Sequence, residues 1–144
     1  MGMVDVGDKP VIRRLAEASG RIHLSPETIM KIKQGAILKG DPLVIAEVGG
    51  MNAAKQTHLL IPHCHQIALD KVELSFDISS QWIEASCIAS AQARTGVEME
   101  ALVGVTTALN VIWDMVKYLE KDKDGQYPGT RMDAIRVIRK EKGL

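Results

Sequence analysis

The stretch VELSFDISSQWIEASCIASA, residues 72–91, decides the fold of this chain. Over residues 72–78 apolar side chains alternate with polar ones, the pattern of a strand with one buried face and one wet face. Small or apolar residues alternate in a similar way over residues 82–91, and a short polar segment, residues 79–81, forms a turn between the two. The pattern therefore predicts an antiparallel β-hairpin.

Other signals place helices and strands around this hairpin. Ser25 and Pro26 are typical of a helix start, and Gly35 is a natural stop. From the N-terminus we expect a basic, mobile arm (1–24), a helix (26–35), a strand (43–48), a short helix (52–60), the hairpin (72–91), a long helix (97–120), a loop (121–130) and a strand (132–138). This order predicts an α+β fold of ferredoxin-like type, an antiparallel sheet covered by helices.

Composition limits the function classes. A chain of 144 residues is sized for one domain, residues 1–144, that buries about two-thirds of its unfolded surface. A formal net charge of zero argues against a general nucleic-acid binder or a polybasic membrane-surface protein. Only 3% of residues are aromatic, so base-stacking platforms are not expected. Two cysteines and an N-terminus without an apolar segment predict a cytoplasmic protein.

The long helix carries no charge between Glu100 and Asp114, and its apolar residues point in every direction. A helix that is apolar all round must be buried all round. It is too short, with ends too charged, for a membrane span of about 20 apolar residues. One face can cover the sheet, and the other needs a second copy. We therefore predict an obligate homo-oligomer, built on a two-fold dimer with this helix at the interface.

Polar residues form a line along the same helix. Glu100, Thr107 and Asp114 fall on nearly one stripe, and Lys117 lies one turn beyond. The first and last of the three are roughly 21 Å apart at the helical rise per residue, too far for one small substrate. If two such helices pack antiparallel, Glu100 of one chain approaches Asp114 and Lys117 of the other. The hypothesis is an active site shared between two subunits.

Chemistry-bearing residues lie at both ends of this helix. Glu98 and Glu100 flank Met99 at the helix start, where they could accept hydrogen bonds from a donor-rich heterocycle or merely complement the helix dipole. Asp114 and Lys117, spaced i and i+3, are a candidate acid/base couple or a structural ion pair. Basic residues that could together neutralise a triphosphate, though each alone is typical of a surface, are Lys39, Lys55, Lys140 and Arg14.

The segment His63-Cys64-His65 raises the alternative of a metal site. In an extended segment the two histidines point the same way, as zinc ligands could, and a zinc-dependent hydrolase is then one alternative. A third ligand at matching spacing is missing, so we expect no metal and a histidine that binds or protonates an organic ligand. We expect Cys64 to be a buried small hydrophobe rather than a nucleophile.

Four motifs together resemble the cyclic pyranopterin monophosphate synthase family of molybdenum cofactor biosynthesis: TGVEMEAL, AAKQTHLLIPHCH, LKGD and WDMVK. The resemblance covers nearly the whole chain. It implies a lyase that converts 3′,8-cyclo-7,8-dihydro-GTP, a cyclised GTP derivative, into cyclic pyranopterin monophosphate and releases pyrophosphate. It also implies that no redox cofactor is required, although Mg²⁺ could accompany the triphosphate, and a homohexamer arranged as a trimer of dimers.

The resemblance also assigns roles to residues. The catalytic residues it implies are Asp114, Lys117 and Lys39. The substrate-binding residues that match the family's motifs are Cys64, His65, Glu98, Met99, Glu100 and Lys140. To these we add His63, next to the Cys-His motif, and Arg14, for its positive charge. Two positions depart from the family motif Leu-Cys-His-Pro, since His63 replaces the leucine and Gln66 the proline. Lys140 matches the lysine of a tail that has fewer glycines here. The alternative from another class is a noncatalytic nucleotide- or pterin-binding regulatory oligomer, which would leave the Asp114–Lys117 couple unexplained.

Overall fold

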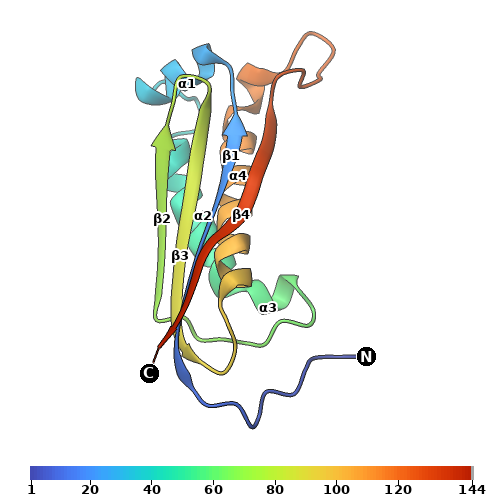
Figure 1. Cartoon of the computed structure of the whole chain (residues 1–144). Helices are drawn as coiled ribbons and strands as arrows, with labels where there is room; N and C mark the ends of the chain where they lie inside the picture. Colours follow the sequence, from blue (N-terminus) through green and yellow to red (C-terminus); the bar gives the residue numbers. More distant parts are fainter. Residues whose placement is uncertain (144) are drawn as a thin grey trace.

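A computed structural model describes residues 1–143 and has an antiparallel four-stranded sheet in the order β2-β3-β1-β4 (Figure 1). Helices cover one face of the sheet, and this arrangement confirms the predicted α+β class. In chain order the elements are β1 (Ile12–His23), α1 (Pro26–Lys33), α2 (Pro42–Lys55), α3 (Thr57–Leu60), β2 (Lys71–Ile78), β3 (Trp82–Ala93), α4 (Glu98–Glu120) and β4 (Arg131–Gly143).

The predicted hairpin is present as β2 and β3. The two strands pair antiparallel from Lys71 opposite Ser90 to Ile78 opposite Ile83. The hydroxyl of Ser79 closes the turn, because its oxygen accepts a hydrogen bond from the backbone N–H of Trp82 at 3.1 Å. The predicted strands and the predicted turn between them are both confirmed.

The expected N-terminal arm, residues 1–24, is wrong for its second half. Residues 12–23 form β1, which lies inside the sheet and pairs with both β3 and β4. Ala16, Ala18 and Ile22 are fully buried in the core. Charged residues interrupt the apolar alternation of this strand, so the sequence pattern does not reveal it. Burial of one face and pairing with strands on both sides stabilise the strand in spite of these residues.

The expected strand at residues 43–48 is also wrong, because these residues belong to α2. Asp41 caps the helix, and its carboxylate accepts hydrogen bonds from the backbone N–H groups of Leu43 at 2.9 Å and Val44 at 3.4 Å. Pro42 takes the first helical position, where its missing N–H is harmless. The cap outweighs the strand preference of the apolar residues. The short helix expected at 52–60 is divided between the end of α2 and α3.

Close backbone approaches hold α4 against the rest of the fold. A Cβ added at Gly104 would lie 2.7 Å from the sulfur of Cys87 on β3, and one added at Gly50 on α2 would lie 2.8 Å from the Gly104 carbonyl oxygen. Only glycine permits these distances. By length and composition alone α4 could cross a membrane, but 56% of its most apolar window is buried inside the fold. That burial is typical of the core helix of a globular domain, and the second copy on its other side stays a prediction.

Candidate active site

The predicted catalytic residues meet at the C-terminal end of α4. The Lys117 ammonium nitrogen lies 2.9 Å from Oδ1 of Asp114, one helical turn away. Lys39 comes from the turn after α1, and its Nζ donates a hydrogen bond to the Asp114 carbonyl oxygen at 2.9 Å. The same Nζ lies 3.5 Å from Oδ2 of Asp114. Two cations therefore flank one carboxylate, and we call these three residues the lysine cluster.

Asp114 and the two lysines of the lysine cluster stabilise one another's charged forms. The hydrogen bond and positive charge of Lys117, followed by the charge of Lys39, lower the pKa of Asp114. Asp114 in turn raises the pKa of Lys117. Near neutral pH these shifts keep the carboxylate ionised and the ammonium protonated. The side chains remain 60% and 40% exposed, so the couple lies at an open surface.

A hollow of about 410 Å³ opens beside the lysine cluster. Trp113 and Tyr127 form part of its wall and pack edge to face, with ring centroids 5.1 Å apart. Tyr127 lies in the charged loop after α4 and is a residue that the sequence motifs do not single out. An aromatic residue among charged, Gly- and Pro-containing neighbours is the signal that could have drawn notice to it.

Two carboxylates stand in the first turn of α4, at the opposite end of the helix. Glu100 is only 4% exposed, and burial, followed by the negative charge of Glu98, raises its pKa. Glu98 places Oε1 3.3 Å from Nζ of Lys140. Its other oxygen, Oε2, is buried and has no hydrogen-bond partner within residues 1–143. A Cβ at Gly96 would collide with Oε2 of Glu98, so a larger residue there would displace this carboxylate.

Cys64 lies next to these acids. Burial, and then the charges of Glu100 and Glu98, raise the pKa of its thiol, so the sulfur stays protonated and is a poor nucleophile. It is half-buried rather than buried, which partly corrects the expectation of a core hydrophobe. Met99 is also half-buried, within the same first turn of α4. We call the group formed by Cys64, His65, Glu98, Met99, Glu100, Lys140 and Arg14 the acid cluster.

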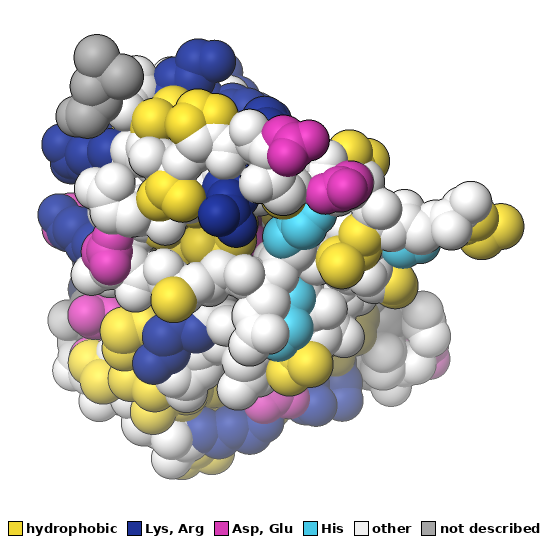
Figure 2. All heavy atoms as spheres, turned by 90° about the horizontal axis from the view of Figure 1, so that it is seen from below, with side chains coloured by type: hydrophobic (Ala, Val, Ile, Leu, Met, Phe, Trp, Pro, Cys, Tyr) yellow, Lys and Arg dark blue, Asp and Glu magenta, His cyan; other side chains and the backbone are white. Residues whose placement is uncertain are grey.

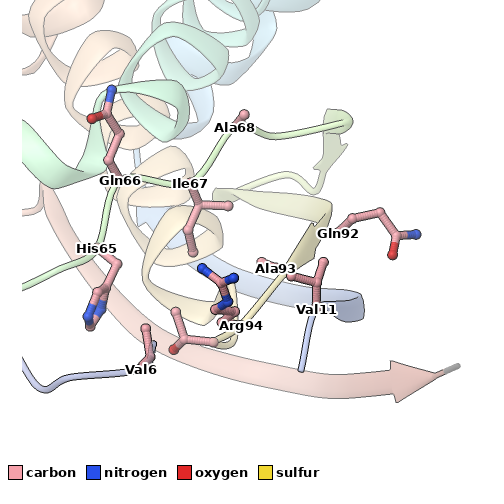
Figure 3. Close-up of a pocket in the computed structure, with 10 residues that line it drawn as sticks. Val6, Val11, His65, Gln66, Ile67, Ala68, Gln92, Ala93 and Arg94 are labelled. Atoms are coloured by element: carbon pink, nitrogen blue, oxygen red, sulfur yellow. The ribbon is translucent and has the colours of Figure 1, made fainter. Parts of the chain in front are cut away.

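The two histidines of the His63-Cys64-His65 segment have separate surroundings. The backbone N–H of Cys64 bonds to the Ile61 carbonyl at 3.0 Å, so this segment is a turn and not the extended strand that the zinc alternative assumed. His63 is exposed. Nε2 of His65 lies 2.6 Å from the Val4 carbonyl oxygen, and the side chain borders a hollow of about 310 Å³ (Figure 3). Within residues 1–143 no group of three or more His, Cys, Asp or Glu side chains is arranged to hold a metal ion.

Basic side chains complete this end of the molecule. Arg14 on β1 donates hydrogen bonds to the carbonyls of Ala93 at 3.4 Å and Arg94 at 3.2 Å. Together with Lys140 it lines a second hollow of about 310 Å³. The last strand runs beyond the expected residues 132–138, and its pairing with β1 brings Lys140 to this position. Figure 2 looks onto this end and shows histidine, acidic and basic side chains near one another. Lys55, at the end of α2, is exposed and lines neither hollow.

The two clusters cannot form one site within a single chain. Glu98 and Asp114 are separated by about 24 Å along α4 at the helical rise per residue. The structure thus brings together the predicted residues at each end of the helix but does not join the two groups. A second copy of the chain would be needed to do so.

Comparisons with known proteins agree on one relationship. A family model described as the MoaC family matches residues 3–143. A protein of Thermococcus kodakarensis named "Probable cyclic pyranopterin monophosphate synthase" is 52% identical over 141 residues, which cover 98% of this chain and 90% of the relative. Proteins with the same name in Methanocorpusculum labreanum and Thermoplasma acidophilum are 51% and 45% identical, covering 98% and 97% of this chain and 89% and 98% of the relatives.

Proposed function

The chain belongs to the MoaC family, and from that premise we propose that it is a lyase of molybdenum cofactor biosynthesis. Its substrate in this proposal is (8S)-3′,8-cyclo-7,8-dihydroguanosine 5′-triphosphate, and its products are cyclic pyranopterin monophosphate and pyrophosphate. The observation that carries the proposal is the contact of Lys117 and Lys39 with Asp114 beside an open hollow.

The lysine cluster supplies what this reaction needs. Closing a cyclic monophosphate requires an oxygen of the substrate to attack the α-phosphorus while the bond to the β-phosphate breaks. Asp114 can take the proton from the attacking hydroxyl, and Lys117 can give one to a nitrogen or oxygen released as the rings rearrange. Lys39 adds a positive charge where negative charge builds up on the departing pyrophosphate.

The acid cluster would hold the purine-derived ring. Within residues 1–143 one buried oxygen of Glu98 has no hydrogen-bond partner, which suits an N–H group of a guanine-like ring. Glu100, Met99, Cys64 and His65 would line the same place, while Lys140 and Arg14 contribute positive charge. His63 is exposed, so any contact it makes would come at the edge of the site.

A partner subunit would unite the two clusters in the proposed enzyme. Large apolar side chains remain exposed on the outer side of this chain, on α2 (Val44, Ile45, Val48) and on β4 (Ile135, Ile138). Such surfaces are typical of subunit contacts. We propose a homohexamer, a trimer of dimers with active sites at the dimer interface, that works in the cytoplasm without a redox cofactor. Mg²⁺ would accompany only the triphosphate, and neither nucleic acid nor membrane is a partner.

Pyrophosphate release tests the proposed function. Purified protein is mixed with the cyclised GTP derivative, phosphate products are quantified, and the pterin product is identified by mass. We expect pyrophosphate and cyclic pyranopterin monophosphate in equal amounts, and none from GTP itself, the matched control ligand. Tight binding without turnover would overturn the lyase and support the noncatalytic regulatory oligomer. Metal present at one equivalent per chain, measured by elemental analysis, would revive the zinc-dependent hydrolase.

A further inference from the structure

The turn that carries Lys39 contacts the last turns of α4. Ile37 is buried, but the side chain of Leu38 is 85% exposed and anchors nothing within residues 1–143. The backbone N–H of Leu38 instead donates a hydrogen bond to the hydroxyl oxygen of Tyr118 at 2.9 Å. Tyr118 follows Lys117 directly on α4. One side chain of the last turn of α4 therefore fixes the backbone next to Lys39.

Glu120, also in that last turn, fixes the other end of the same segment. Its two carboxylate oxygens accept hydrogen bonds from the backbone N–H of Ser25, each at 3.2 Å, and one of them also accepts from the hydroxyl of Thr28. Thr28 is 1% exposed and belongs to the first turn of α1. The chain from Ser25 to Lys39 is thus attached to α4 at both ends.

A fixed backbone matters for Lys39 because its own side chain is long and flexible. Lysine carries its charge on a stem with four carbons and many rotamers, so its average position depends on where the backbone is held. We propose that Tyr118 is a positioning residue, which holds the turn so that the Lys39 ammonium stays against Asp114. The proposal rests on the proposed function, in which Lys39 stabilises the departing pyrophosphate.

Replacing Tyr118 by phenylalanine removes only the hydroxyl. We expect Tyr118→Phe to lower kcat/KM for pyrophosphate release about fivefold, the loss that one hydrogen bond can explain. Tyr118→Phe should change the same kinetic constant, kcat or KM, that Lys39→Ala changes. In a Lys39→Ala background, Tyr118→Phe should have no further effect, since its target is gone. Ser79→Ala is the matched control, because Ser79 also bonds backbone through a hydroxyl, in the β2–β3 turn, and it should leave both constants unchanged.

Hydrogen exchange gives a readout that does not depend on turnover. The Leu38 amide should exchange faster in Tyr118→Phe than in the wild type, while α4 amides keep their protection. An unchanged kcat/KM in Tyr118→Phe would overturn the proposal, as would an equal loss in the Lys39→Ala background. A wild-type protein that releases no pyrophosphate would instead overturn the proposed function, and the role of Tyr118 in that reaction would fall with it. Wild-type turnover is measured first, so the two failures are distinguishable.

Discussion

The two ends of α4 present opposite electrostatic environments. At the C-terminal end, Asp114 lies between two lysines, is largely exposed, and has a lowered pKa. At the N-terminal end, Glu100 is buried beside another carboxylate and has a raised pKa. One helix therefore keeps one acid ionised and makes another costly to ionise.

The difference indicates a division of labour along the helix. An ionised acid next to ammonium groups suits proton transfer and phosphate chemistry. At the other end, Glu100 is buried and Oε2 of Glu98 has no hydrogen-bond partner within residues 1–143. This arrangement suits ligand recognition, because a ligand that donates hydrogen bonds would satisfy these oxygens. Neither end contains both properties, so the comparison points to an assembly in which unlike ends meet.

Loss of Lys117 is expected to have the largest effect. Lys117→Ala should lower kcat for pyrophosphate release about 10³-fold, because the proton donor is removed. Lys71→Ala is the matched control, since Lys71 also lies 2.9 Å from a carboxylate, that of Glu73 on β2, and does not line the hollow beside the lysine cluster. It should leave kcat unchanged. If Lys117→Ala keeps more than about a tenth of the wild-type activity, the proposed role of Lys117 in proton transfer at the C-terminal end of α4 is wrong.

Mixing two inactive variants tests whether unlike ends meet. In a heterodimer of Glu100→Gln and Asp114→Asn, one site carries both substitutions and the other carries neither. With random exchange half of the dimers are mixed, so about a quarter of wild-type activity should return. Subunit exchange is verified by native mass spectrometry of differently tagged chains. Full exchange without recovery would mean that each site is built within one chain.

The opposite pKa shifts predict smaller and opposite effects on stability. The raised pKa of Glu100 means that the folded state binds its proton more tightly, so this contribution is full below pH 4.5 and is lost as pH rises through the raised pKa. Glu100→Gln should therefore raise Tm by a few degrees near neutral pH and by less in acid. For Asp114, with a lowered pKa, the contribution exists above pH 3.8 and is lost as pH falls.

Asp114→Asn should accordingly lower Tm slightly at neutral pH and not at low pH. The effect is small because the ion pair lies at the surface. Thermal unfolding followed by circular dichroism between pH 3 and 8 would measure both variants. Shifts of the same sign in the two variants would contradict the contrast between the two ends.

The predictable part of the fold is the part whose residues alternate clearly. In β2 and β3, large apolar residues such as Leu74 and Ile83 mark the buried face. In β1 the buried residues Ala16, Ala18 and Ile22 lie on the same side of the strand as Arg14 and Gly20. This interruption breaks the apolar alternation, so β1 gave no readable strand signal although β3, whose buried residues are also small, did.

The helix caps show what the sequence could have revealed. Ser25-Pro26 predicts a helix start, and Asp41-Pro42 has the same cap chemistry, although the apolar run after it favours a strand. In the site, the spacing of Asp114 and Lys117 was sufficient to predict their contact. The bond from Leu38 to Tyr118 was not predictable, since it joins residues whose separation in space depends on how α1 packs.

The position of Thr107 gains meaning from the spacing of Glu100 and Asp114. Thr107 stands seven residues from each, half-buried on the same helix. When two copies of α4 pair so that each acid end faces the other's lysine end, the two-fold axis passes through this midpoint. Thr107 would then be the residue that meets itself. In that dimer a substitution at Thr107 would place two changed side chains next to each other at the two-fold axis, and it would affect both active sites equally.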